Sequence, residues 1–141
     1  MTKVVVWIAE CTWHACVDAA RLIADAEVTL VHVVDAEVAE AMQGAYGGLL
    51  SRHGHAPDVS ALVGPAEQAL VEDAAARLGT PCATDVRQGR IEHEVVAACA
   101  DADVLICARD GRRDHAGPKS LGHHTRFVVD HAPCGVLLVW P

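Results

Sequence analysis

The chain has 141 residues, of which 52% are hydrophobic, so its length and composition exclude a disordered protein and allow one domain with its own core. The formal net charge of −8 argues against general nucleic-acid binding, because an acidic surface repels phosphate backbones. The amino-terminal apolar run ends at Glu10 and is shorter than a signal peptide or a membrane span, so we expect a cytoplasmic protein.

The first half of the chain predicts two buried strands and two helices. Residues 3–8 (KVVVWI) and 28–34 (VTLVHVV) are apolar runs typical of buried strands. Apolar residues at helical spacing predict a helix over residues 12–25, with Thr12 as its N-cap, and another over residues 65–78. Between the second strand and this helix, apolar residues recur at helical spacing: Val38, Met42, Tyr46 and Leu49. Three glycines in the same stretch, at positions 44, 47 and 48, weaken the prediction of a helix there.

The second half continues the alternation of strands and helices. Residues 83–87 (ATDVR) alternate in polarity as a half-exposed edge strand does. A helix is expected from Ile91, then a strand over residues 104–108, a helix over residues 120–131 and a last strand over residues 136–140. Strict alternation of strands and helices favours one parallel sheet with helices on both faces.

Two stretches resemble a known family. The segment QGRIEHEVVAACADADVLI (88–106) and the closing HAPCGVLLVW (131–140) resemble the universal stress protein family, and the likeness extends over the whole chain. It implies a single domain over residues 1–141 with an α/β fold. That fold is a doubly wound, Rossmann-like, five-stranded parallel sheet of order 3-2-1-4-5. It also implies a homodimer through the last strand: Val136, Leu137, Leu138, Val139 and Trp140.

In such a sheet, ligands bind beyond the carboxyl ends of the strands where the strand order reverses. Here that point lies between strands 3–8 and 104–108. Its walls would be residues 9–12 and 109–125, with residues 33–35 nearby. The strand–loop–helix segment that begins at residue 104 is typical of a phosphate-binding element.

The resemblance implies ATP or another adenine nucleotide as ligand. Family members that bind ATP carry a loop of Gly, two residues, Gly, nine residues, Gly, then Ser or Thr. Here Ala108, Gly111 and Gly122 take the glycine positions with ten residues in the second gap, and two histidines follow. The usual Asp-Gly-Ser after the first strand reads Ala9-Glu10-Cys11. The candidate ligand residues are Ala9, Glu10, Val33, Val34, Ala108, Arg109, Gly111, Gly122, His123 and His124.

This altered loop leaves three functions open. The first is a dimeric binding or signalling module with a degenerate adenine-nucleotide crevice. The second is a ligand-free dimerisation or interaction protein with a closed crevice, in which the glycines only form turns. The third is a weak nucleotide hydrolase, which rests on analogy of fold. No catalytic set stands out, since Glu92 and Glu94 are explained as charges that suit a helix N-terminus.

Histidines and cysteines near the crevice raise the question of a metal. Cys11, His14, Cys16, His123 and His124 combine the thiolate and imidazole ligands that suit zinc or Cu(I). Cys16, however, lies on the apolar stripe of its helix, where a thiol behaves as a small hydrophobe. We therefore expect no metal, and we expect His32, inside a strand, to be a hydrogen-bonded core residue.

Overall fold

Five apolar segments form one parallel sheet in the computed structural model, which describes residues 1–41, 60–114 and 120–141. The strand order is β3-β2-β1-β4-β5, so the predicted fold class and order are confirmed. The strands are β1 (Thr2–Trp7), β2 (Ala26–Asp35), β3 (Ala83–Gly89), β4 (Val104–Ala108) and β5 (Gly135–Val139).

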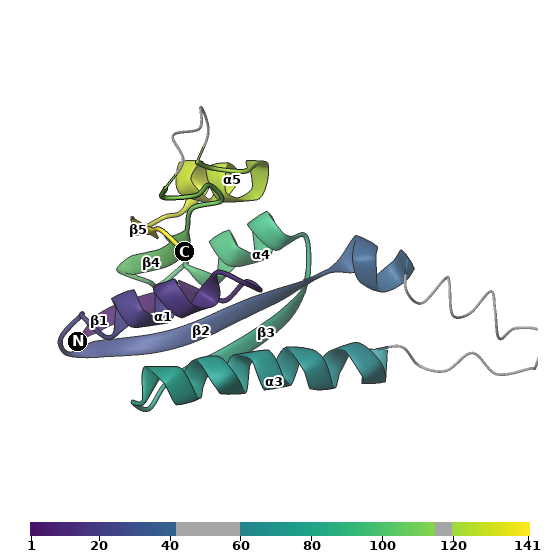
Figure 1. Ribbon diagram of the computed structural model, residues 1–141, viewed down its shortest axis with the longest axis horizontal. Coiled ribbons are helices and arrows are strands. Elements are labelled where there is room, and N and C mark those ends of the chain that lie inside the picture. The colour runs from purple at the N-terminus through teal and green to yellow at the C-terminus, as the bar shows by residue number, and fades with distance from the viewer. Residues whose placement is uncertain (42–59, 115–119) are drawn as a thin grey trace, which may run out of the picture.

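Helices cover both faces of the sheet (Figure 1). The alternating side chains of β1 show the division: Val4 and Val6 belong to one core cluster and Val5 to the other. The first cluster packs under α1 and α3, and the second under α4 and α5. These helices are α1 (Trp13–Ala20), α3 (Ser60–Leu78), α4 (Ile91–Ala98) and α5 (His123–His131).

The two edge strands of the sheet are β3 and β5. β3 lies at one edge and shows alternating exposure, as predicted for a half-exposed edge strand. It continues two residues beyond the predicted end, because Asp35 at the end of β2 still pairs with Gly89. β5 lies at the opposite edge and pairs with β4 in the described part of the chain.

Helix α1 is shorter than predicted, ending at Ala20 instead of Asp25. The Leu22 and Ile23 amides bond to carbonyls three residues back, so the apolar spacing continues through a turn that is no longer α-helical. Asp25 then takes a positive φ of 51° and turns the chain into β2. Thr12 is the N-cap residue, but its hydroxyl makes no capping hydrogen bond, so the predicted cap is only positional.

Two other helix starts were predicted wrongly. Helix α3 begins at Ser60 and runs through Pro65, although proline suits a first turn and removes one backbone hydrogen bond further in. Helix α5 begins at His123 rather than at residue 120, because Ser120 and Gly122 bond to Asp110 in the preceding loop. The expected stripe through Met42, Tyr46 and Leu49 lies outside the described residues.

No helix in the described ranges is long and apolar enough to cross a membrane.

Candidate functional site

A cavity of about 270 Å³ lies at the carboxyl ends of β1 and β4. It joins the residues just after β1 to the start of α5, so two stretches more than 100 residues apart meet at one crevice, as the strand order requires. Its lining residues are Trp7, Ile8, Ala9, Glu10, His32, Val33, Ile91, Asp110, His124 and Thr125.

Four of the ten candidate ligand residues line this cavity: Ala9, Glu10, Val33 and His124. The other six do not: Val34, Ala108, Arg109, Gly111, Gly122 and His123. Sequence reasoning did not single out Asp110 or Thr125, although both fall in the stretch expected to form a wall. Trp7 could have been found from strand periodicity, because it shares a face of the chain with Ala9.

His32 forms part of the cavity wall and is also held in the core. Its side chain is almost fully buried, and its Nδ1 donates to the Ile8 carbonyl at 2.6 Å. Its Nε2 pairs with the carboxylate of Glu67 on α3. The prediction of a hydrogen-bonded core histidine is therefore confirmed, and the pair ties β2 to α3 beneath the crevice.

A buried carboxylate orients His124. Glu92, only 6% exposed, accepts a hydrogen bond from His124 Nδ1 at 2.8 Å and another from Arg90 at 3.0 Å. Its own backbone N–H, together with His124 and Arg90, overcomes the effect of burial and lowers the pKa of Glu92 to about 2. Glu92 is thus more than a first-turn charge, since it joins α4 to α5 and orients the His124 ring at the cavity.

The loop after β4 is closed by Asp110. The Asp110 carboxylate accepts the Gly122 N–H at 2.5 Å, and its backbone N–H donates to the Ser120 carbonyl at 2.8 Å. A Cβ at position 122 would lie 3.2 Å from the Asp110 carboxylate, so glycine permits this close approach. Burial raises the pKa of the nearby Cys107 to about 12, and the Asp110 charge adds to the rise.

Arg109, which the sequence suggested as a phosphate donor, points toward β5. Its guanidinium donates to the Ser120 hydroxyl at 2.8 Å and lies over the Trp140 ring, 4.9 Å from the centroid. Its backbone N–H donates to the Val139 carbonyl at 2.8 Å. The charge is therefore engaged between the loop and the last strand and is absent from the cavity lining.

The thiols and imidazoles near the crevice do not assemble. In the part of the chain that the structure describes, no group of three or more His, Cys, Asp or Glu side chains could hold a metal ion. Cys16 is fully buried in the core, as predicted, and burial raises its pKa to about 12, which disfavours the thiolate that metals bind. Cys11 is exposed.

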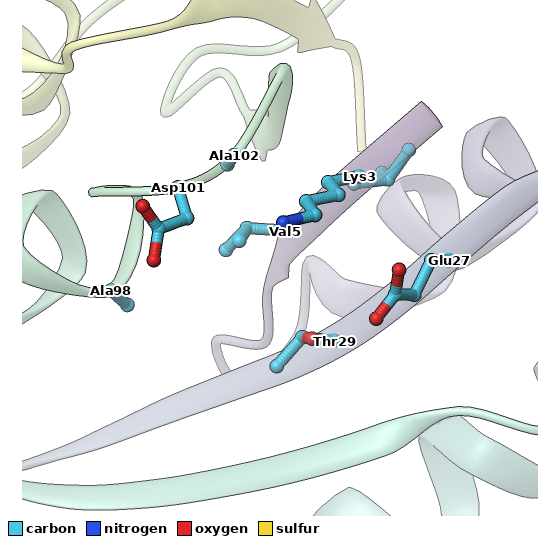
Figure 2. A pocket seen from close by; sticks show the side chains of 8 residues that line it. Lys3, Val5, Glu27, Thr29, Ala98, Asp101 and Ala102 are labelled. Carbon is cyan, nitrogen blue, oxygen red and sulfur yellow. The ribbon is translucent and has the colours of Figure 1, made fainter. Parts of the chain in front are cut away.

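Two further cavities lie toward the amino ends of the strands. One of them has a volume of about 200 Å³. Figure 2 shows how Lys3, Glu27 and Thr29 project from β1 and β2 at this cavity. Asp101, from the turn after α4, lies on its other side. A larger one, of about 590 Å³, is lined by residues at the ends of α1 and α3. Since ligands of open parallel sheets bind at the carboxyl ends, the cavity between β1 and β4 is the best candidate.

Comparison with known proteins supports one family. The model of the universal stress protein family matches residues 2–139. No match to a curated protein was found.

Solved structures resemble the whole chain. The universal stress protein UspA from Lactobacillus plantarum is 20% identical, with a TM-score of 0.60 over 98% of this chain and 97% of that one. A universal stress protein in complex with cAMP is 18% identical, with a TM-score of 0.59 over 99% and 96%. The hypothetical protein MJ0577 is 16% identical, with a TM-score of 0.65 over 99% and 96%. With the family match over nearly the full length, the chain belongs to the universal stress protein family.

Proposed function

We propose that this protein is a dimeric binding or signalling module, formed by one domain over residues 1–141, whose crevice between β1 and β4 takes an adenine nucleotide weakly or in a modified way. The cavity of about 270 Å³ at the reversal of strand order carries the proposal. The related structure in complex with cAMP supports an adenine-containing ligand. We expect the protein to act in the cytoplasm.

The two sides of the cavity suit different parts of such a ligand. Val33 and Ile91, from the core cluster under α4 and α5, offer apolar surface for a planar base. His124 and Thr125, at the first turn of α5, offer polar groups for the ribose and what it carries. Ala9 and Glu10 form the edge of the crevice, and the glycines at positions 111 and 122 shape the loop beside it.

A ligand titration tests this proposal. Thermal unfolding is followed with adenosine, AMP, ADP and ATP at millimolar concentration. A ligand at 100 times its Kd should stabilise the fold by about 2.7 kcal/mol. Ala9→Leu, which adds bulk inside the cavity, should abolish the shift, whereas Ala100→Leu at an exposed position should keep it. No shift with any of the four ligands contradicts the proposal.

The homodimer is proposed through β5. This strand has a neighbour on one side only among the described residues, and Leu137 is 40% exposed. An apolar edge strand is a template for pairing with another chain, and pairing with a second copy would cover it. The strand segment assigned to the interface is Val136, Leu137, Leu138, Val139 and Trp140.

A ligand-free dimerisation or interaction protein is the second candidate. The Asp110 carboxylate already accepts the Gly122 N–H, so this contact at the start of α5 forms without a ligand. A weak nucleotide hydrolase is the third candidate. Release of phosphate from ATP above the background rate would support it. Absence of any ligand-induced shift in the titration favours the second candidate over the first.

A further inference from the structure

We propose that Asp110 is a specificity-determining residue, whose carboxylate takes the place of a ligand phosphate at the start of α5, so that the crevice prefers an uncharged nucleoside to a nucleotide. The inference rests on the proposed function, since it names the ligand class that the same cavity takes.

The position of the carboxylate is the first argument. The first N–H groups of a helix have no partner within the helix, and they are the usual donors to a bound phosphate. At the start of α5, the N–H of the N-cap residue Gly122 donates a hydrogen bond to the Asp110 carboxylate at 2.5 Å. Asp110 also lines the cavity. A phosphate at this end of the helix would therefore lie beside a carboxylate.

The charges around the cavity are the second argument. Among the described residues, the lining includes two carboxylates, Glu10 and Asp110, and no lysine or arginine. The two lining histidines are each paired with a further carboxylate, His32 with Glu67 and His124 with Glu92. The added negative charge of a phosphate in the cavity therefore meets repulsion from carboxylates at short range.

The guanidinium of Arg109 is the third argument. It is the arginine nearest to Asp110 in sequence, yet it is bonded to Ser120 and stacked on Trp140. It makes no hydrogen bond to Asp110 in the described structure. Arg109 thus directs its positive charge toward β5, whereas Asp110 lines the crevice with its negative charge.

Asp110→Asn separates a specificity role from a structural one. The asparagine carbonyl can still accept the Gly122 N–H, so the loop is kept while the charge is removed. If Asp110 only stabilises the loop, the order of ligand affinities stays the same. If Asp110 sets specificity, the affinity of Asp110→Asn for phosphate-bearing ligands rises relative to its affinity for adenosine. Asp101→Asn, an exposed residue at the other end of the sheet, changes the net charge equally and serves as the control.

Isothermal titration of the full chain with adenosine, cAMP, AMP and ATP tests the proposal. The wild type and Asp101→Asn should bind adenosine at least about tenfold more tightly than AMP, and ATP more weakly still. In Asp110→Asn the ratio of adenosine to AMP affinity should fall to about threefold or less. Nucleotide binding that arises only in Asp110→Asn also supports the assignment.

Two results overturn the inference in different ways. ATP or AMP binding to the wild type as tightly as adenosine, or a ratio unchanged in Asp110→Asn, removes the specificity role and leaves the proposed function intact. Failure of all four ligands to bind any of the three proteins removes the proposed function, and the inference with it.

Discussion

Replacement of Glu92 by glutamine tests the buried contact between α4 and α5. The carboxylate is 6% exposed and accepts hydrogen bonds from His124 at 2.8 Å and Arg90 at 3.0 Å. Glutamine is nearly isosteric but neutral, and its NH₂ group must face one of these donors. Loss of one hydrogen bond to a charged group costs about 1.5–3 kcal/mol. We expect Glu92→Gln to lower the free energy of unfolding by about 2 kcal/mol at pH 7.

The difference in free energy of unfolding between wild type and Glu92→Gln should depend on pH, because the pKa of Glu92 is lowered in the folded protein. Because the folded-state pKa of Glu92 is about 2, below the ordinary value of 4.5, the ionised group stabilises the fold fully above about pH 4.5. The stabilisation is lost as the pH falls through the folded-state value. The gap between wild type and Glu92→Gln should therefore be constant near neutrality, shrink below about pH 4.5 and close near pH 2.

Urea unfolding followed by circular dichroism gives the measurement. With a slope near 2 kcal/mol per molar urea, the midpoint at pH 7 should fall by about 1 M. Glu72→Gln, which removes the same charge from an exposed position on α3, should move the midpoint little. The reasoning is refuted if both variants shift equally, or if the Glu92→Gln gap persists unchanged at pH 2.

Three further predictions concern other parts of the molecule. Leu138→Glu should make the protein monomeric in analytical ultracentrifugation, because it places a charge on the proposed β5 interface; an unchanged dimer rules out that interface. Gly79→Ala should lower stability by about 1 kcal/mol in urea unfolding, because Gly79 has a φ of +73° with open space around it; a neutral effect would contradict the conformational argument. In a thiol titration at pH 8, exposed Cys11 should react first and Cys11→Ser should remove that fast phase. Three buried thiols, whose pKa values burial raises to about 12, should react only on unfolding: Cys16, Cys99 and Cys107. Their prompt reaction in the folded protein would contradict this assignment.

The sequence predicted the sheet and its crevice because both follow from regular alternation. Apolar runs at β1, β2 and β4 fixed the central strands, and a parallel sheet places their carboxyl ends together. Helix ends were predicted less well. Ile23 keeps helical spacing while it lies in a turn beyond α1, so periodicity alone extended the helix too far.

The charged residues of the site could not be predicted in the same way. A carboxylate in a polar loop, such as Asp110, has the pattern of a solvated residue until the start of α5 is placed beside it. Glu92 has the pattern of a first-turn charge, and only the crossing of α5 buries it against His124. The direction of Arg109 depends on Trp140, 31 positions away in the sequence. Each case is decided by a contact between distant segments.

The attachment of Arg109 to the last strand links the proposed dimer edge to the crevice. Its backbone is bonded to Val139 and its guanidinium rests on Trp140, while the next residue, Asp110, forms the mouth of the cavity. A displacement of the terminal strand would thus be transmitted mechanically to the crevice within a single peptide unit. Substitutions at Trp140 should accordingly be assayed for assembly and for ligand affinity in the same preparation.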